Sequence, residues 1–229
     1  MDVAKFNNET YSFNAVPEFS VTWQYDATMF SQPVHAYPNA RIDNILPLRM
    51  NDINQIYLNM HWTYGVGKAS MQLTDKKALS SEKLVANVAM NMFLDKDIET
   101  AVNGTRAKHE VMVWFAAFGD SAQPIGFNNG IVTTRELNGT IFNLYSGLKG
   151  KTYVFTWVVE KITERFVGDL WPLISDLFSL DGSSYPKEDD YLGSLSFGTE
   201  AFSSDGNITF WANRYEIDVR HGHRIAPKM

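Results

Sequence analysis

The chain has no cysteine among its 229 residues, which excludes disulfide bridges, thiolate metal sites and cysteine nucleophiles. It also lacks an excess of positive charge, because 20 Lys and Arg residues face 26 Asp and Glu residues and the net charge is −6. A protein that binds nucleic acid normally needs a basic face to meet the phosphates. No segment approaches the ~18 consecutive apolar residues of a membrane helix. We therefore expect a compact, monomeric protein with neither nucleic acid nor membrane as a partner.

Two features of the sequence give conflicting indications of the cellular compartment in which the protein acts. Four Asn-X-Thr sequons begin at Asn8, Asn103, Asn138 and Asn207, and such sites favour a secreted glycoprotein. The absence of cysteine favours the cytosol, because secreted chains often carry disulfides. Residues Met1–Asn8 lack the apolar segment of a signal peptide. We interpret the chain as a mature extracellular protein whose signal peptide is absent from this sequence.

Strand-like runs rich in Val, Ile, Thr, Tyr, Phe and Trp recur between clusters of Gly, Asn, Asp and Ser. One segment differs, since residues 169–180 place Leu and Ile at helical spacing with Pro172 in the first turn. One helix among many strands predicts an all-β sandwich of two antiparallel sheets with one packed α-helix. No linker or repeat interrupts the chain, so residues 1–229 are expected to form one domain. The strands are expected at residues 19–25, 83–93, 110–118, 140–145, 152–160, 190–197 and 207–219.

The strand expected at residues 110–118 carries an unusual face. Alternate side chains of a strand share a face, so Glu110, Met112 and Trp114 form one row, continued by Ala116 and Phe118. The other row, Val111 to Ala117, suits a sandwich core. A carboxylate beside a flat ring is typical of sugar chemistry, because a pyranose stacks on Trp while the acid acts at the anomeric carbon. The same row also fits an exposed Glu110 at a strand start, with Trp114 in a second small core.

A second carboxylate follows small residues in the segment from Ser194 to Ser204. Ser196, Gly198 and Glu200 share one face of an extended chain, and a Gly beside an acid allows a ligand to approach the backbone closely. The segment alone equally fits a bulge or a strand end with a solvated Glu200.

Taken together, the two segments resemble glycoside hydrolase family 12, the β-jelly-roll endoglucanases and xyloglucanases. Glu110-Val-Met-Val-Trp114 is similar to the nucleophile strand of that family, and Gly198-Thr-Glu-Ala-Phe202 is similar to its acid/base segment. Further similarity lies at residues 84–89, 145–147, 154–156 and 166–170, so the resemblance covers about residues 20–219. It implies a jelly roll with an open substrate cleft on its concave face.

The resemblance also implies a mechanism and a set of site residues. Glu110 would be the nucleophile and Glu200 the acid/base of a retaining hydrolysis, in which two carboxyl groups lie roughly 5–5.5 Å apart and a glycosyl-enzyme forms. No cofactor and no metal would be needed. The residues expected to bind substrate are Asn87, Asn91, Met112, Trp114, Pro124 and Phe202. Pro124 is also a common turn residue, and Phe202 also suits a core.

Two departures from the family pattern are visible. Asn91 stands where the family has an Asp beside the nucleophile, so it can donate a hydrogen bond to Glu110 but adds no charge. The family's N-terminal Trp, which stacks a sugar, is missing, so either Tyr11 substitutes for it or that subsite is weak. We predict a retaining endo-β-1,4-glucanase that acts on cellulose-type or mixed-linkage β-glucans. The alternatives are a xyloglucan-specific endoglucanase and a non-hydrolytic β-glucan-binding protein on the same fold.

Overall fold

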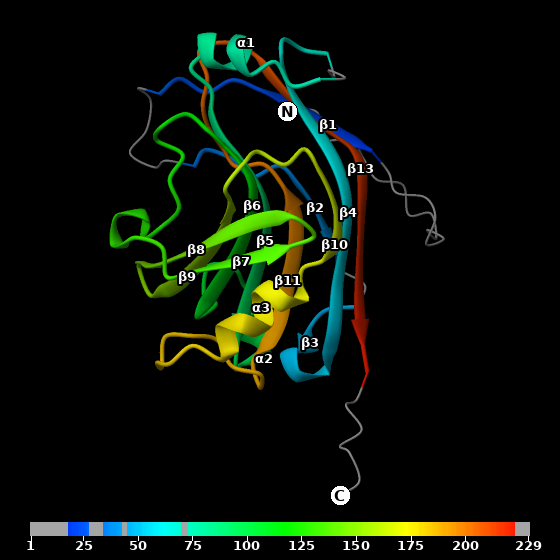
Figure 1. Ribbon diagram of the computed structural model, residues 1–229, viewed down its shortest axis with the longest axis vertical. Helices are drawn as coiled ribbons and strands as arrows, with labels where there is room; N and C mark the ends of the chain where they lie inside the picture. The colour runs from blue at the N-terminus through cyan, green and yellow to red at the C-terminus, as the bar shows by residue number, and fades with distance from the viewer. Residues whose placement is uncertain (1–17, 28–33, 43–44, 70–72, 223–229) are drawn as a thin grey trace, which may run out of the picture.

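Two β-sheets pack face to face in the computed structural model, which describes residues 18–27, 34–42, 45–69 and 73–222. The sequon at Asn8 and the Tyr11 side chain lie outside these described residues. Figure 1 shows the two longest strands, β4 and β13, running side by side along the molecule. In chain order the strands are β1 (Phe19–Trp23), β2 (Asn39–Ile42), β3 (Leu48–Arg49), β4 (Ile53–Val66), β5 (Val85–Asp95), β6 (His109–Phe118), β7 (Thr133–Leu137), β8 (Thr140–Lys149), β9 (Thr152–Val159), β10 (Arg165–Asp169), β11 (Tyr191–Gly198), β12 (Ala201–Ser203) and β13 (Ile208–His221).

The smaller sheet has the strand order β1-β13-β4-β10, and the larger sheet has the order β2-β11-β5-β6-β9-β8-β7, with β12 beside β5 and β3 beside β11. The expectation of antiparallel sheets holds for every strand pair of the described chain except one, because β6 and β9 are parallel. This pair is parallel because the chain forms the β7–β8 hairpin before it returns beside β6. All of the expected strands are present, and β4, which runs through residues 53–66, is an additional long one.

The core between the sheets is aliphatic and aromatic. From β6 it receives Val111, Val113 and Phe115, all fully buried, as the alternation predicts. Ala116 and Phe118 also lie in this core, so their expected place in the Glu110 row is wrong. The cause is a bulge: Ala89 of β5 pairs with Trp114 and Val88 pairs with Ala116, which leaves Phe115 as an extra residue on β6. One inserted residue reverses the alternation beyond it.

The expected helix is α3 (Trp171–Phe178), with Pro172 in its first turn. Its buried side chains pack into the core, and the Trp157 indole donates to the Leu173 carbonyl at 2.9 Å. Two short helices, α1 (Lys76–Ser81) and α2 (Ile98–Ala101), were not expected. Each is capped by an aspartate that precedes it, and helices of one or two turns carry too little periodicity to be read from sequence. In the part of the chain that the structure describes, no helix has the length and apolar character needed to cross a membrane.

Candidate active site

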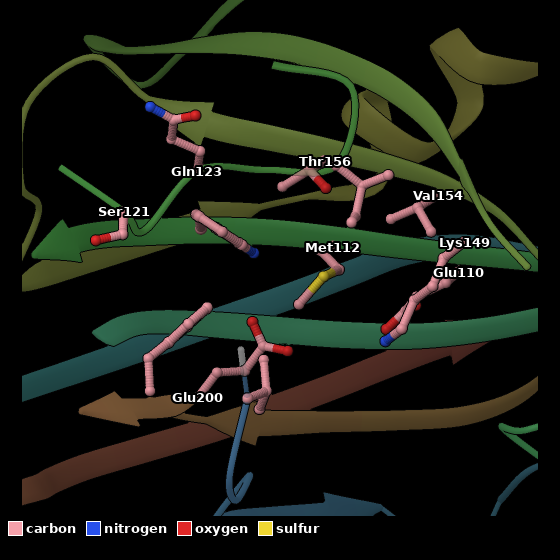
Figure 2. Close-up of a pocket in the computed structure, with 12 residues that line it drawn as sticks. Glu110, Met112, Ser121, Gln123, Lys149, Val154, Thr156 and Glu200 are labelled. Carbon is pink, nitrogen blue, oxygen red and sulfur yellow. The ribbon is translucent and has the colours of Figure 1, made fainter. Parts of the chain in front are cut away.

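The larger sheet has a second face, turned away from the core, which carries Glu110, Met112 and Trp114; we call it the cleft face. Figure 2 shows that the Glu110 and Glu200 side chains project to the side of the sheet on which Met112 lies. The two carboxyl groups line one cavity. The cavity is lined by Val34, Glu110, Met112, Trp114, Ser121, Gln123, Ile125, Lys149, Val154, Thr156, Glu200 and Phe202.

Glu110 lies on the central strand β6 and is only 6% exposed. The amide nitrogen of Asn91, on the neighbouring strand β5, donates to Glu110 Oε1 at 2.9 Å. Asn91 faces Met112 across the β5–β6 ladder, so its side chain shares the cleft face with Glu110. Carboxyl oxygens accept hydrogen bonds, so this donor holds the Glu110 side chain in place from the side of β5.

Glu200 sits between β11 and β12 and is 9% exposed. The amide group of Asn87 holds it twice: Asn87 Nδ2 donates to Glu200 Oε2, and Asn87 Oδ1 accepts from the Glu200 backbone N–H at 3.0 Å. Burial raises the pKa of Glu200 to about 7, and the negative charge of Glu110 adds to the rise, whereas the Asn87 donor and the Lys149 charge oppose it. Glu200 therefore holds its proton at a pH where an ordinary glutamate is ionised.

A chain of buried hydrogen bonds supports this clamp from the core side. The Trp23 indole donates to the Tyr64 hydroxyl at 3.1 Å, and that hydroxyl lies 2.8 Å from Thr199 Oγ1. Thr199 Oγ1 in turn donates to the Asn87 carbonyl. These hydrogen bonds connect β1 and β4 of the smaller sheet to Thr199, the residue before Glu200. Packing of the two sheets thus sets the backbone position of Asn87 and Glu200.

Three polar atoms at the site are buried and have no hydrogen-bond partner among the described residues: Asn91 Oδ1, Trp114 Nε1 and Thr156 Oγ1. Trp114 and Thr156 line the cavity itself. Buried polar groups are usually paired, so these three atoms are exceptions, and they lie in residues at or beside the cavity.

The structure brings together most of the residues that the sequence singled out. Met112, Trp114 and Phe202 line the cavity beside Glu110 and Glu200. Asn87 is fully buried and its amide is taken up by Glu200, so it contacts the acid rather than presenting a surface to substrate. Asn91 is 6% exposed and contacts Glu110 from the side. Pro124 is buried, and its neighbours Gln123 and Ile125 line the cavity in its place.

Several lining residues were not predicted. Val154 and Thr156 lie on β9, in register with Glu110 and Met112. Only the parallel pairing of β6 with β9 places them there, and a pairing such as Glu110 with Val154, 44 positions apart, leaves no local signal. Lys149 enters the cavity from the end of β8, in the turn before β9. A lysine beside Gly150 looks like an ordinary turn residue in the sequence.

Comparison with known proteins agrees with this geometry. The pattern of "Glycosyl hydrolase family 12" matches residues 69–220. The chain belongs to this family. It is 30% identical over 211 residues to a xyloglucan-specific endo-beta-1,4-glucanase A of Aspergillus aculeatus, an alignment that spans 92% of this chain and 76% of that protein. As a member of family 12 the chain is a glycoside hydrolase, and its substrate is a glycan.

Solved structures of family 12 share the fold. Endoglucanase 3 of Trichoderma harzianum superposes with a TM-score of 0.69 at 24% identity, covering 89% of this chain and 78% of that one. A family 12 xyloglucanase from Bacillus licheniformis superposes with a TM-score of 0.68 at 18% identity, covering 90% of this chain and 84% of that one. The predicted jelly roll and the predicted family are therefore confirmed.

Proposed function

We propose that this protein is a retaining endo-β-1,4-glucanase in which Glu110 is the nucleophile and Glu200 the acid/base. One observation carries the proposal: two carboxyl groups share a cavity, one bonded by an amide donor and the other buried so that its pKa is raised to about 7. Such a division of roles between two carboxyl groups is what glycoside hydrolysis requires. The whole chain would act as one catalytic domain.

In the first step, Glu110 attacks the anomeric carbon while Glu200 gives its proton to the departing glycosidic oxygen. A glycosyl ester forms on Glu110, which thereby loses its negative charge. Because that charge helps to raise the pKa of Glu200, its loss makes Glu200 a stronger acid and leaves it ionised. The Glu200 carboxylate then takes a proton from water, which attacks the ester and releases the sugar with its original configuration.

Asn87 is proposed as a positioning residue. Its amide spans the backbone and the carboxyl of Glu200, so it fixes the direction in which the proton is delivered. Met112, Trp114 and Phe202 would contact the sugars, Asn91 would orient Glu110, and Pro124 would act only through the loop that carries Gln123 and Ile125.

Xyloglucan is the second candidate substrate, beside cellulose-type and mixed-linkage glucans. It is favoured by the relatives, since the curated proteins from several Aspergillus species and from Neosartorya fischeri, at 30–33% identity, are named as xyloglucan-specific endoglucanases, several of them as probable ones. Both candidates share a β-1,4-glucan backbone and the same chemistry at Glu110 and Glu200. They differ in whether the cleft accepts branches.

A reducing-end assay on xyloglucan, carboxymethyl cellulose, barley β-glucan and xylan tests the proposal. We expect turnover of at least one of the three glucans, none of xylan, and a first product of unchanged anomeric configuration by proton NMR. Inversion of configuration would overturn the roles given to Glu110 and Glu200. Binding of glucan without turnover by the parent protein would favour the β-glucan-binding protein instead.

We further propose that the enzyme is a monomer and that it is secreted. Secretion is expected because polysaccharides meet enzymes outside the cell. Asn103 is the sequon whose side chain supports this: it is exposed, and its Oδ1 accepts from Thr105 at 2.8 Å, which leaves its amide nitrogen for a glycan. The amide nitrogen of Asn138 instead donates to the Val167 carbonyl at 2.9 Å. Mass spectrometry of the protein expressed in a fungal host tests whether Asn103 carries a glycan.

A further inference from the structure

The row of residues that crosses the active site continues beyond the cavity. Tyr145 of β8 pairs with Thr156 of β9, which pairs with Met112 of β6, which pairs with Asn91 of β5. Residues paired in this way lie on one face of a sheet, about 4.8 Å apart from strand to strand. Tyr145 therefore lies on the cleft face, about 10 Å from Met112 in the direction that crosses the strands.

An exposed aromatic ring covers Tyr145. Phe127, in the short helix η2 (Phe127–Asn129), stacks on the Tyr145 ring with centroids 5.6 Å apart and an angle of 29° between the planes. Phe127 is 42% exposed. The Tyr145 ring therefore supports the Phe127 ring from one side while a large part of the Phe127 side chain stays open to solvent.

The loop that carries Phe127 is anchored to β8. Gly126, with a φ of +86°, packs against the Ser146 carbonyl so closely that a Cβ would clash there. Asn129 Nδ2 donates to the Ser146 carbonyl at 3.3 Å, and the Val132 N–H donates to the Leu144 carbonyl at 2.8 Å. The aromatic pair is thus held before any ligand arrives, which reduces the entropy lost on binding.

The aromatic pair is continuous with the active site. Ile125, two residues before Phe127, lines the cavity with Glu110 and is itself 38% exposed. Exposed apolar surface next to a cavity is characteristic of ligand-binding grooves. Asn143 lies two residues before Tyr145 on the same face of β8, and its Oδ1 accepts from Thr134 Oγ1 at 2.8 Å. This bond uses the amide oxygen of Asn143, so the amide nitrogen of Asn143, which is a hydrogen-bond donor, points away from Thr134.

We propose that Phe127 and Tyr145 form a binding subsite for a glucosyl unit of the glucan backbone, away from the scissile bond. A pyranose ring has an apolar face, which stacks on an exposed aromatic ring. It also has an edge of hydroxyl groups, which suits an amide such as that of Asn143. This inference rests on the proposed function, since it supposes that a glucan chain lies along the row from Asn91 to Tyr145.

The test compares the parent with Phe127→Ala, Phe127→Tyr and Ile131→Ala. Ile131 is the matched control, because it is an exposed apolar residue of the same loop region. Each protein is assayed on oligosaccharides with three to six backbone glucosyl units, taken from the glucan that the polysaccharide assay selects. We expect Phe127→Ala to lower kcat/KM on the longest oligosaccharide about five- to tenfold, through KM, and to leave the shortest one unchanged.

Phe127→Tyr should keep the parental value, because the flat ring is retained, and Ile131→Ala should match the parent. The subsite is refuted if Phe127→Ala has no effect at any length, an equal effect at every length, or an effect shared by Ile131→Ala. A parent that cleaves no glucan overturns the proposed function instead. In that case calorimetry with cellohexaose still tests the subsite, since the parent should bind at least fivefold more tightly than Phe127→Ala.

Discussion

The two faces of strand β6 show how one segment serves two purposes. On one face, Val111, Val113 and Phe115 are fully buried in the core between the sheets. On the other, Met112 and Trp114 form a small cluster with Ala89, open to a cavity that also holds Glu110. The first face is saturated by contacts with the protein itself. The second leaves polar atoms at Trp114 and Thr156 unpaired among the described residues.

This difference indicates that the core face of β6 contributes mainly to stability, whereas its cleft face contributes mainly to reactivity. The core face holds β6 rigidly, which fixes the direction of Glu110 on the other face. The cleft face is then free to carry groups that folding alone would disfavour, above all the buried carboxyl of Glu200. Substitutions on the two faces should therefore affect different measurements.

The largest effect is expected for Glu110→Gln on the cleft face. Removal of the proposed nucleophile should lower kcat by about 10⁴-fold or more, because the proposed mechanism has no other group that can form the glycosyl ester. The melting temperature should stay near that of the parent. The measurement is turnover of the preferred glucan, and Glu160→Gln, which changes an exposed glutamate at the end of β9, serves as the control. Equal loss in both variants would contradict the assignment.

Phe115→Ala tests the core face. The Phe115 ring is fully buried and contacts Phe142, Phe166 and Phe197, so its loss should lower the free energy of unfolding by about 3–5 kcal/mol. Trp114→Ala should lower it less, because water can fill a space that opens to the cavity, and should raise KM instead. Urea unfolding and steady-state kinetics separate the two results. A larger loss of stability at Trp114 would break the comparison between the faces.

Glu200→Gln should stabilise the protein at alkaline pH. The folded pKa of about 7 lies above the ordinary value of 4.5, so the folded state binds the proton more tightly than the unfolded state does. The free energy of unfolding of the parent should therefore fall as the pH rises from about 4.5 to 7, by about 3 kcal/mol in total.

The Gln variant lacks this titration, so it should be more stable than the parent above pH 7 and equal to it below pH 4.5. Chemical unfolding at several pH values gives the measurement, and activity should be lost at every pH. A parent whose stability rises from pH 4.5 to 7 relative to the variant would show that Glu200 is not held protonated.

The smallest effect is expected for Asn91→Asp. The new carboxyl would replace a donor that lies 2.9 Å from Glu110 Oε1, and two carboxyl groups in contact cannot both ionise readily. We expect an added ionisation in the pH profile of kcat/KM, with a change in the maximal rate of less than about tenfold. Asn59→Asp, on the smaller sheet, is the control. Superimposable profiles for the parent and Asn91→Asp would show that Asn91 has no influence on Glu110.

Much of the fold could be predicted because apolar and polar residues alternate along the strands, whereas the apolar residues of the helical segment 169–180 recur with the period of a helix. The expected helix at 169–180 was found at Trp171–Phe178. The prediction of side-chain direction was wrong where one extra residue reverses the alternation of the residues that follow it. This occurs at the Phe115 bulge, which turns Ala116 and Phe118 towards the core. Prediction also failed for helices α1 and α2, which depend on single capping residues.

The sequence singled out Glu110 and Glu200 as candidates only when their two segments were taken together, because that combination resembles family 12, whereas each segment alone also fitted an ordinary exposed glutamate. Only the tertiary structure decided their environment. The clamp of Asn87 on Glu200, the cavity walls from β9 and the Phe127–Tyr145 pair all join residues distant in the chain. Alternation is a local property of one strand, whereas burial, shared hydrogen bonds and the resulting pKa arise only when separate strands are paired and stacked.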